Sequence, residues 1–135
     1  MSILSQGKLR FHVLGIPHTI TGPEWSVCPF TTKVWKFAKM MKEKGHYVIH
    51  YGHEQSNVDC DEHVTLINNQ DFKDAYGDYN WKEKGLYYYQ KNDDLCHVKF
   101  NTLAVIEIKE RLQQGDFILC FWGKGHQYVG SCFMK

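Results

Sequence analysis

The sequence opens with a strand, a helix and a second strand in close succession, and this order constrains the fold more than any other feature. Residues 9–15 (LRFHVLG) form a short apolar run typical of a buried strand. Residues 30–44 have the periodicity of an amphipathic helix, and residues 47–51 (YVIHY) indicate a second strand. Two parallel strands need a crossover connection of this kind. The segment therefore predicts a βαβ unit of a parallel sheet.

The predicted helix has one apolar face and clear signals at its ends. Gly45 suits the position just after a helix C-terminus. Five lysines fall on or beside the opposite face, which we interpret as solvated. The apolar face recurs at spacings of three and four residues and comprises Phe30, Val34, Phe37, Ala38 and Met41.

The remainder of the chain predicts the rest of the same sheet. Residues 64–67 (VTLI) indicate a short third strand, and residues 102–113 a helix that Asn101 would cap. Residues 116–122 (DFILCFW) indicate a fourth strand, which would place Cys120 in the core. Residues 70–94 lack a clean period, so we interpret them as an irregular excursion with one short helix. The sequence thus predicts a single-domain α/β fold, Rossmann-like, with an open, mainly parallel sheet and flanking helices.

Composition excludes several classes of function. The net charge of the 135 residues is +1, and the sequence has no dense block of lysine and arginine, which argues against binding to nucleic acid or to a membrane surface. No apolar run approaches the roughly 20 residues of a membrane span. The five cysteines are an odd number without paired spacing, which favours reduced thiols and a cytoplasmic location.

Polar segments follow three of the predicted strands, at residues 16–29, 52–61 and 123–126. Ligands of parallel sheets bind at the carboxyl ends of the strands, so we expect these segments to form the site. The first is unusually long for its position and offers His18, Thr19, Thr21, Glu24 and Ser26.

The candidate catalytic residues are His18, as a general base or hydroxyl partner, and Glu54, as a base or hydrogen-bond acceptor. The alternatives are a loop histidine without a role and a solvated carboxylate. The candidate substrate-binding residues are Gly15, Thr19, Gly52, His53, Gly123, Lys124 and His126. A plain turn is the alternative for residues 123–126. Neither a GxGxxG nor a GxxxxGK[ST] motif is present, so direct dinucleotide or P-loop binding is not predicted.

One group of residues has spacing that suits a metal. His50, His53, Cys60 and His63 form the pattern H-x₂-H-x₆-C-x₂-H. His50, however, lies inside a predicted central strand, and the predicted sheet supplies a core without a metal. We therefore predict no metal site.

The segment LRFHVLGIPHTITGPEWSVCPFTTKVWKFAKMMKEKGHYVIHYGHE, with FILCFWGKGH near the end, resembles the N-terminal domain of GT-B-fold glycosyltransferases of viral, phage and bacterial type. The resemblance covers most of the chain and is weakest over residues 71–97. The Gly-Gly pair often found after the first strand of that family is absent here.

The resemblance implies an acceptor-side domain spanning residues 1–135, with the donor domain missing from this chain. The activity implied is transfer of a sugar from a nucleotide-sugar co-substrate to a hydroxyl of a carbohydrate acceptor, without a further cofactor. Residues 15–19, 52–54 and 123–126 would line the cleft. The alternative is a non-catalytic Rossmann-like binding module, or a subunit completed by a partner chain or by homo-oligomerisation.

Overall fold

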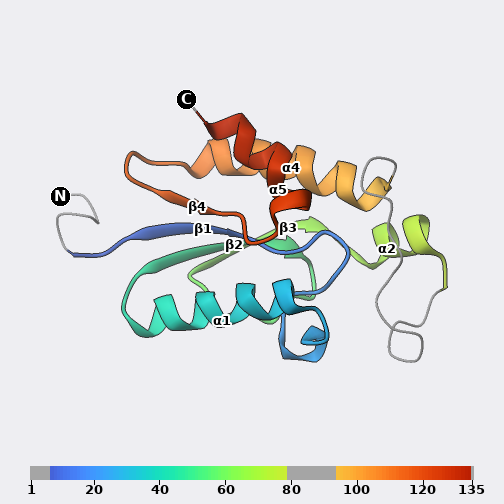
Figure 1. Cartoon of the computed structure of the whole chain (residues 1–135), viewed down its shortest axis with the longest axis horizontal. Helices are drawn as coiled ribbons and strands as arrows, with labels where there is room; N and C mark the ends of the chain where they lie inside the picture. The colour runs from blue at the N-terminus through green and yellow to red at the C-terminus, as the bar shows by residue number, and fades with distance from the viewer. Residues whose placement is uncertain (1–6, 79–93, 135) are drawn as a thin grey trace.

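The computed structural model describes residues 7–78 and 94–134. Its centre is an all-parallel sheet of four strands in the order β3-β2-β1-β4 (Figure 1). The strands are β1 (Arg10–Leu14), β2 (Tyr47–His53), β3 (Glu62–Ile67) and β4 (Phe117–Leu119). The sequence prediction of a Rossmann-like parallel α/β fold is therefore confirmed.

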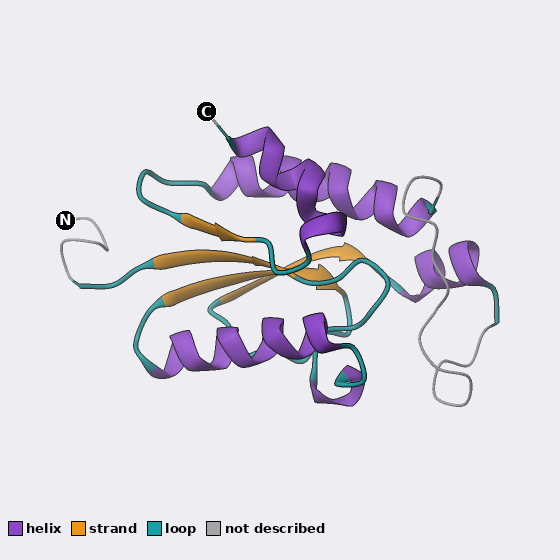
Figure 2. Cartoon of the chain, viewed as in Figure 1, coloured by secondary structure: helices purple, strands orange, loops and turns teal. Residues whose placement is uncertain are grey.

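Helices cover both faces of the sheet, as Figure 2 shows. Helix α1 (Pro29–Glu43) lies on one face, whereas α4 (Leu95–Arg111) and α5 (Gly123–Phe133) lie together on the other. Helix α2 (Asn69–Tyr76) follows β3 beyond the carboxyl edge of the sheet, and the single turn η2 (Pro23–Trp25) precedes α1. No helix in the described ranges is long and apolar enough to cross a membrane.

The core consists of two apolar layers because the central strands are buried on both faces. In β1, Phe11 and Val13 pack toward α1, and Leu14 packs toward α4. His12 is fully buried on β1, where its Nδ1 accepts a hydrogen bond from the hydroxyl of Tyr51 at 2.7 Å. Its Nε2 then donates to a carboxylate oxygen of Asp116 at 2.6 Å, which satisfies both ring nitrogens.

The predicted βαβ unit is confirmed almost to the residue. The first strand, helix and second strand lie within two residues of their predicted bounds. Gly45 directly follows the C-cap of α1 with a φ of 86°, a conformation that other residues rarely adopt. Within the predicted irregular excursion, residues 69–76 form the short helix α2, and residues 79–93 lie outside the described part of the chain.

The predicted start of the next helix is wrong. Helix α4 begins at Leu95, and Asp94 caps it by accepting a hydrogen bond from the backbone N–H of His97 at 3.1 Å. Asn101 lies inside the helix. The early turns are stable because Cys96 and Phe100 enter the core, an effect of tertiary packing that local periodicity underestimates.

The fourth strand is shorter than predicted, and residues 123–126 are not a turn. Strand β4 ends at Leu119, so Cys120 lies outside it, and Gly123 begins α5. A Cβ atom at Gly125 would collide with the indole of Trp122. Gly125, in the first turn, therefore lets α5 begin directly against this indole.

Candidate functional site

The three predicted segments meet at the carboxyl edge of the sheet. The backbone N–H of Asn57, after β2, donates to the carbonyl of Thr21, after β1, at 2.8 Å. From α5, Nε2 of His126 donates to the carbonyl of Gly15, also at 2.8 Å. Its Nδ1 accepts from the backbone N–H of Trp122, which defines the tautomer of the neutral ring.

Side chains fill the point where the strand order reverses, between β1 and β4. Many doubly wound folds hold their ligand at such a switch point. Here the rings of His18 and His97 pack edge-to-face on Trp122, with centroids 5.2 and 5.4 Å from it. His126 stacks on Phe100 beside them. Protein rings therefore occupy this position.

His18 belongs to this packed group and is only 5% exposed. Its Nδ1 lies 3.2 Å from Nε2 of His97. Burial, helped by the neighbouring His97, lowers the pKa of His18 to about 3. A group with that pKa is a weak base at neutral pH, because general bases work best when their pKa is near the working pH. Its catalytic role stays a prediction.

The candidate glycines at the strand ends are required by packing within the protein. A Cβ atom at Gly15 would lie 2.7 Å from the hydroxyl oxygen of Thr21 and 3.2 Å from the carbonyl of Tyr51. A Cβ atom at Gly52 would lie 2.9 Å from Cε1 of His50. Gly123, in contrast, has open space around its missing Cβ.

Thr19, His53 and Glu54 differ in their access to solvent. Thr19 is buried, and its hydroxyl lies 2.6 Å from that of Thr31 in the first turn of α1. His53 is buried at the end of β2, where burial lowers its pKa to about 4. Glu54 is exposed, whereas His18 is buried. Lys124 lies in the first turn of α5.

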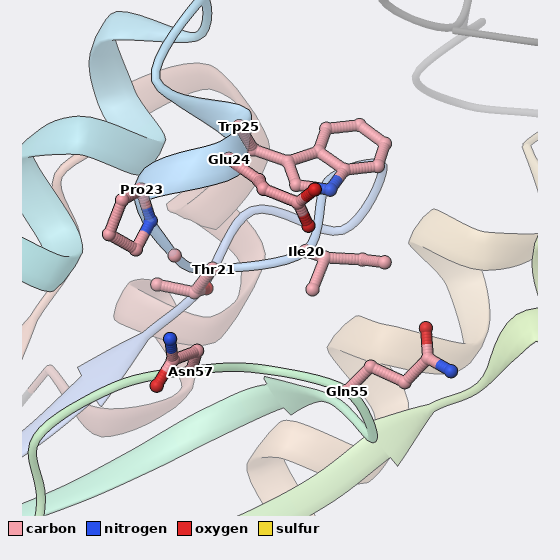
Figure 3. Close-up of a pocket in the computed structure, with 8 residues that line it drawn as sticks. Ile20, Thr21, Pro23, Glu24, Trp25, Gln55 and Asn57 are labelled. Atoms are coloured by element: carbon pink, nitrogen blue, oxygen red, sulfur yellow. The ribbon is translucent and has the colours of Figure 1, made fainter. Parts of the chain in front are cut away.

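A pocket of about 140 Å³ opens where the loop after β1 faces the loop after β2 (Figure 3). We call it the loop pocket; it is lined by residues 20–25, Gln55 and Asn57. Trp25 and Ile20 supply apolar surface on one side, while Gln55 and Asn57 come from the facing loop. The sequence analysis named Thr21 and Glu24 but did not name Gln55 or Asn57. Their position directly after the second strand was the sequence feature that could have identified them.

The wall of the loop pocket is anchored to the sheet through Thr21. Its buried hydroxyl lies 3.1 Å from Nε2 of His50, whose Nδ1 lies 3.0 Å from Nδ1 of His63. Burial, with a smaller effect of His63, lowers the pKa of His50 to about 3, so this ring is neutral at pH 7. The loop after β1 is therefore held at Thr21 by two contacts, one to His50 of β2 and one to Asn57 of the facing loop.

The chemistry of the loop pocket suits hydroxyl groups. The carboxamides of Gln55 and Asn57 each donate and accept hydrogen bonds, and the carboxylate of Glu24 accepts them. Among the residues with assigned positions, no group of three or more His, Cys, Asp and Glu side chains is placed to hold a metal ion. The five cysteines, all within the described ranges, form no disulfide.

Comparisons with protein-family models, with curated proteins and with solved structures find no match to this chain. The geometry therefore supports a small α/β domain with a four-stranded parallel sheet and a polar pocket at its carboxyl edge.

Proposed function

We propose that this chain is a glycosyltransferase-like domain that holds a carbohydrate acceptor in the loop pocket. A nucleotide sugar would donate the transferred unit, and a second domain or partner chain would hold that donor. The observation that carries the proposal is the loop pocket itself, in which two carboxamides face apolar side chains at the carboxyl edge of a parallel sheet.

The lining matches the two kinds of surface that a sugar ring presents. Hydroxyl groups need partners that donate and accept, which Gln55 and Asn57 provide. The C–H groups of the ring need apolar contact, which Ile20 and Trp25 provide. The volume of about 140 Å³ is below the roughly 300–1,000 Å³ of pockets for drug-sized ligands. One small ring, extending toward solvent, is therefore the ligand that fits.

In this proposal Glu54 is the base that accepts the proton of the acceptor hydroxyl. It directly precedes Gln55, which lines the loop pocket, and its side chain is exposed to solvent. His18 is the weaker candidate for this role because its ring is buried and its pKa is about 3.

Binding is tested by titrating the isotope-labelled chain with glucose, galactose and mannose while amide NMR signals are recorded. We expect at least one sugar to shift the signals of Gln55 and Asn57. Gln55→Ala and Asn57→Ala should each weaken binding about fivefold, the loss of roughly one net hydrogen bond. Gln114→Ala is the matched control, since Gln114 is exposed in the turn before β4. Absence of any shift at the pocket would refute the proposal.

Catalysis is tested by mixing the chain with nucleotide sugars and the sugar that binds, and measuring release of nucleoside diphosphate. Glu54→Gln should abolish any release that the unchanged chain supports, whereas Glu110→Gln, an exposed change on α4, should not. Equal release by both variants would exclude Glu54 as the base.

A non-catalytic binding module is the second candidate. The observation in its favour is the weak basicity of His18. It predicts sugar binding at the loop pocket with no release of nucleoside diphosphate, even when a separate donor-binding domain of a glycosyltransferase is added.

A further inference from the structure

The two faces of the β4 segment are covered differently. Ile118 and Cys120 point to the face that carries α4 and α5, where they pack against the larger apolar core. Phe117, Leu119 and Phe121 alternate with them along the chain and point to the face that carries α1. On that second face Phe117 is 49% exposed, and the other two side chains are only partly buried. Apolar side chains of β4 therefore remain accessible beside α1.

The width of a helix explains this exposure. A helix with its side chains is about 10 Å across, whereas neighbouring strands lie about 4.8 Å apart, so one helix covers about two strands. Helix α1 packs on β2 and β1. It meets the β4 side through Phe37, whose ring packs edge-to-face on Phe11 and Phe121 with centroids 5.2 and 5.4 Å away. All-parallel sheets are normally covered on both faces, so a second helix beside α1 would complete this layer.

We call this surface the β4 flank; it consists of Phe37, Phe117, Leu119 and Phe121. Its members are in contact through one aromatic chain, because Phe117 stacks on Phe11 at 5.6 Å and Phe11 in turn packs on Phe37. None of the four residues lines the loop pocket. The β4 flank is therefore a continuous apolar surface that is separate from the proposed sugar site.

The edge of the β4 flank on α1 is basic. Lys33 comes four residues before Phe37 and Lys44 seven residues after it, so both lie on the same side of the helix as Phe37. Both lysines are exposed. The ammonium group of Lys33 lies 5.5 Å from the ring centroid of Phe30, and that ring lies 6.5 Å from the indole of Trp122, which follows β4. A helix docked beside α1 would therefore meet cations separated by roughly 16 Å along the axis of α1.

We propose that the β4 flank is a docking surface for a helix of a partner protein, apolar toward β4 and lined with Asp or Glu along its edge toward α1. The exposed ring of Phe117 would pack on the apolar face, and Lys33 and Lys44 would pair with the acidic edge. A second copy of this chain fits less well. In a symmetric pair the helix beside this surface would be the α1 of the other copy, whose exposed side also carries lysines, and like charges repel.

Two synthetic 18-residue helical peptides test this docking. Both carry leucine on one helical face, and they differ at the edges of that face, where one has glutamate and the other lysine. Each is titrated into the isotope-labelled chain while amide NMR signals are recorded. We expect the glutamate peptide to shift the signals of residues 117–121 and to bind at least fivefold more tightly than the lysine peptide. Fivefold corresponds to one pair of unit charges about 4 Å apart in water, and the difference should shrink at 0.5 M salt.

Matched variants assign the binding to this surface. Phe117→Ser and Lys33→Glu should each weaken binding of the glutamate peptide about fivefold, through lost apolar contact and through charge reversal. The controls are Ile106→Ser and Lys109→Glu on α4, which lies on the opposite face of the sheet. Ile106 is 48% exposed, nearly the same as Phe117, and Lys109 is exposed like Lys33. These controls should change the affinity less than twofold.

Several results would overturn the proposal. These are the absence of shifts at residues 117–121 with the glutamate peptide, equal affinity of the two peptides, and equal effects of the β4-flank variants and the α4 controls. Sedimentation of the chain alone tests the second copy as occupant. A dimer that Phe117→Ser dissociates would overturn the assignment to a partner protein, whereas a monomer agrees with it. Sugar binding at the loop pocket enters none of these results, so the proposed function stands or fails separately.

Discussion

Mild acid should unfold this protein, because its fold buries an unusual number of neutral imidazole rings. Burial lowers the pKa values to about 3 or 4 for four of them, namely His18, His50, His53 and His126. An unfolded histidine has a pKa near 6.5. Below that pH the unfolded chain binds more protons than the folded chain. The stabilisation is therefore complete above pH 6.5 and decreases as the pH falls toward the folded pKa values.

The expected loss follows from the number of buried rings. Between pH 6.5 and pH 5.5, each such histidine lowers the free energy of unfolding by about 1 kcal/mol. Four rings together give about 4 kcal/mol, which is comparable to the total stability of many domains, roughly 5–15 kcal/mol. Burial lowers the pKa of His12 and His63 in the same direction, which adds to the loss. We expect half-unfolding near pH 5.

Urea unfolding at pH 8.5, 7.5, 6.5 and 5.5, followed by far-ultraviolet circular dichroism, measures this loss. The free energy of unfolding should be nearly constant between the two highest pH values and fall steeply between the two lowest. His126→Gln keeps an N–H donor for the carbonyl of Gly15 and removes one titrating ring. Its proton uptake on unfolding at pH 5.5 should be lower by about one. A free energy of unfolding that changes by less than 1 kcal/mol between pH 7.5 and pH 5.5 would refute the reasoning.

Three further predictions concern the helices and the core. Gly125→Ala should destabilise the protein by about 1–3 kcal/mol because the new methyl group would collide with the indole of Trp122, whereas Gly123→Ala, which has open space, should not. A urea midpoint equal for the two variants would contradict this. Asp94→Ala should cost about 0.5–2 kcal/mol through loss of the α4 cap, measured the same way; an unchanged midpoint would exclude a capping role. Phe100→Ala should cost about 3–5 kcal/mol because its fully buried ring leaves a cavity, and a loss below 1 kcal/mol would show that the core closes around it.

Particular elements show where local sequence was sufficient. The run at residues 9–15 is largely apolar and ends at a glycine, so it indicated a buried strand without knowledge of its neighbours. The apolar spacing in α1 and the glycine after it marked a helix and its end. In α4 the same reasoning found the helix but placed its start too late, at residue 102 instead of Leu95, because the first turns are stabilised by the core they enter.

The candidate site shows the same division. The polar segments after the strands were visible in the sequence, and their meeting at one edge followed from a parallel sheet. Their roles were not visible, because solvent access depends on distant neighbours. His18 is buried against His97 of α4 and against Trp122, which directly precedes α5, and Gly15 is required by Thr21 and Tyr51.

By itself, the sequence determined the four strands along the chain, the helix between the first two, the parallel sheet and the edge where a ligand is expected, whereas it did not predict α5. These features depend on periodicity and on the handedness of the chain, which act over short distances. Only the tertiary structure decided that histidine and tryptophan rings fill the switch point and that a pocket lies between Thr21 and Asn57. The physical reason is that burial, pKa and pocket shape are set by contacts between segments far apart in the chain.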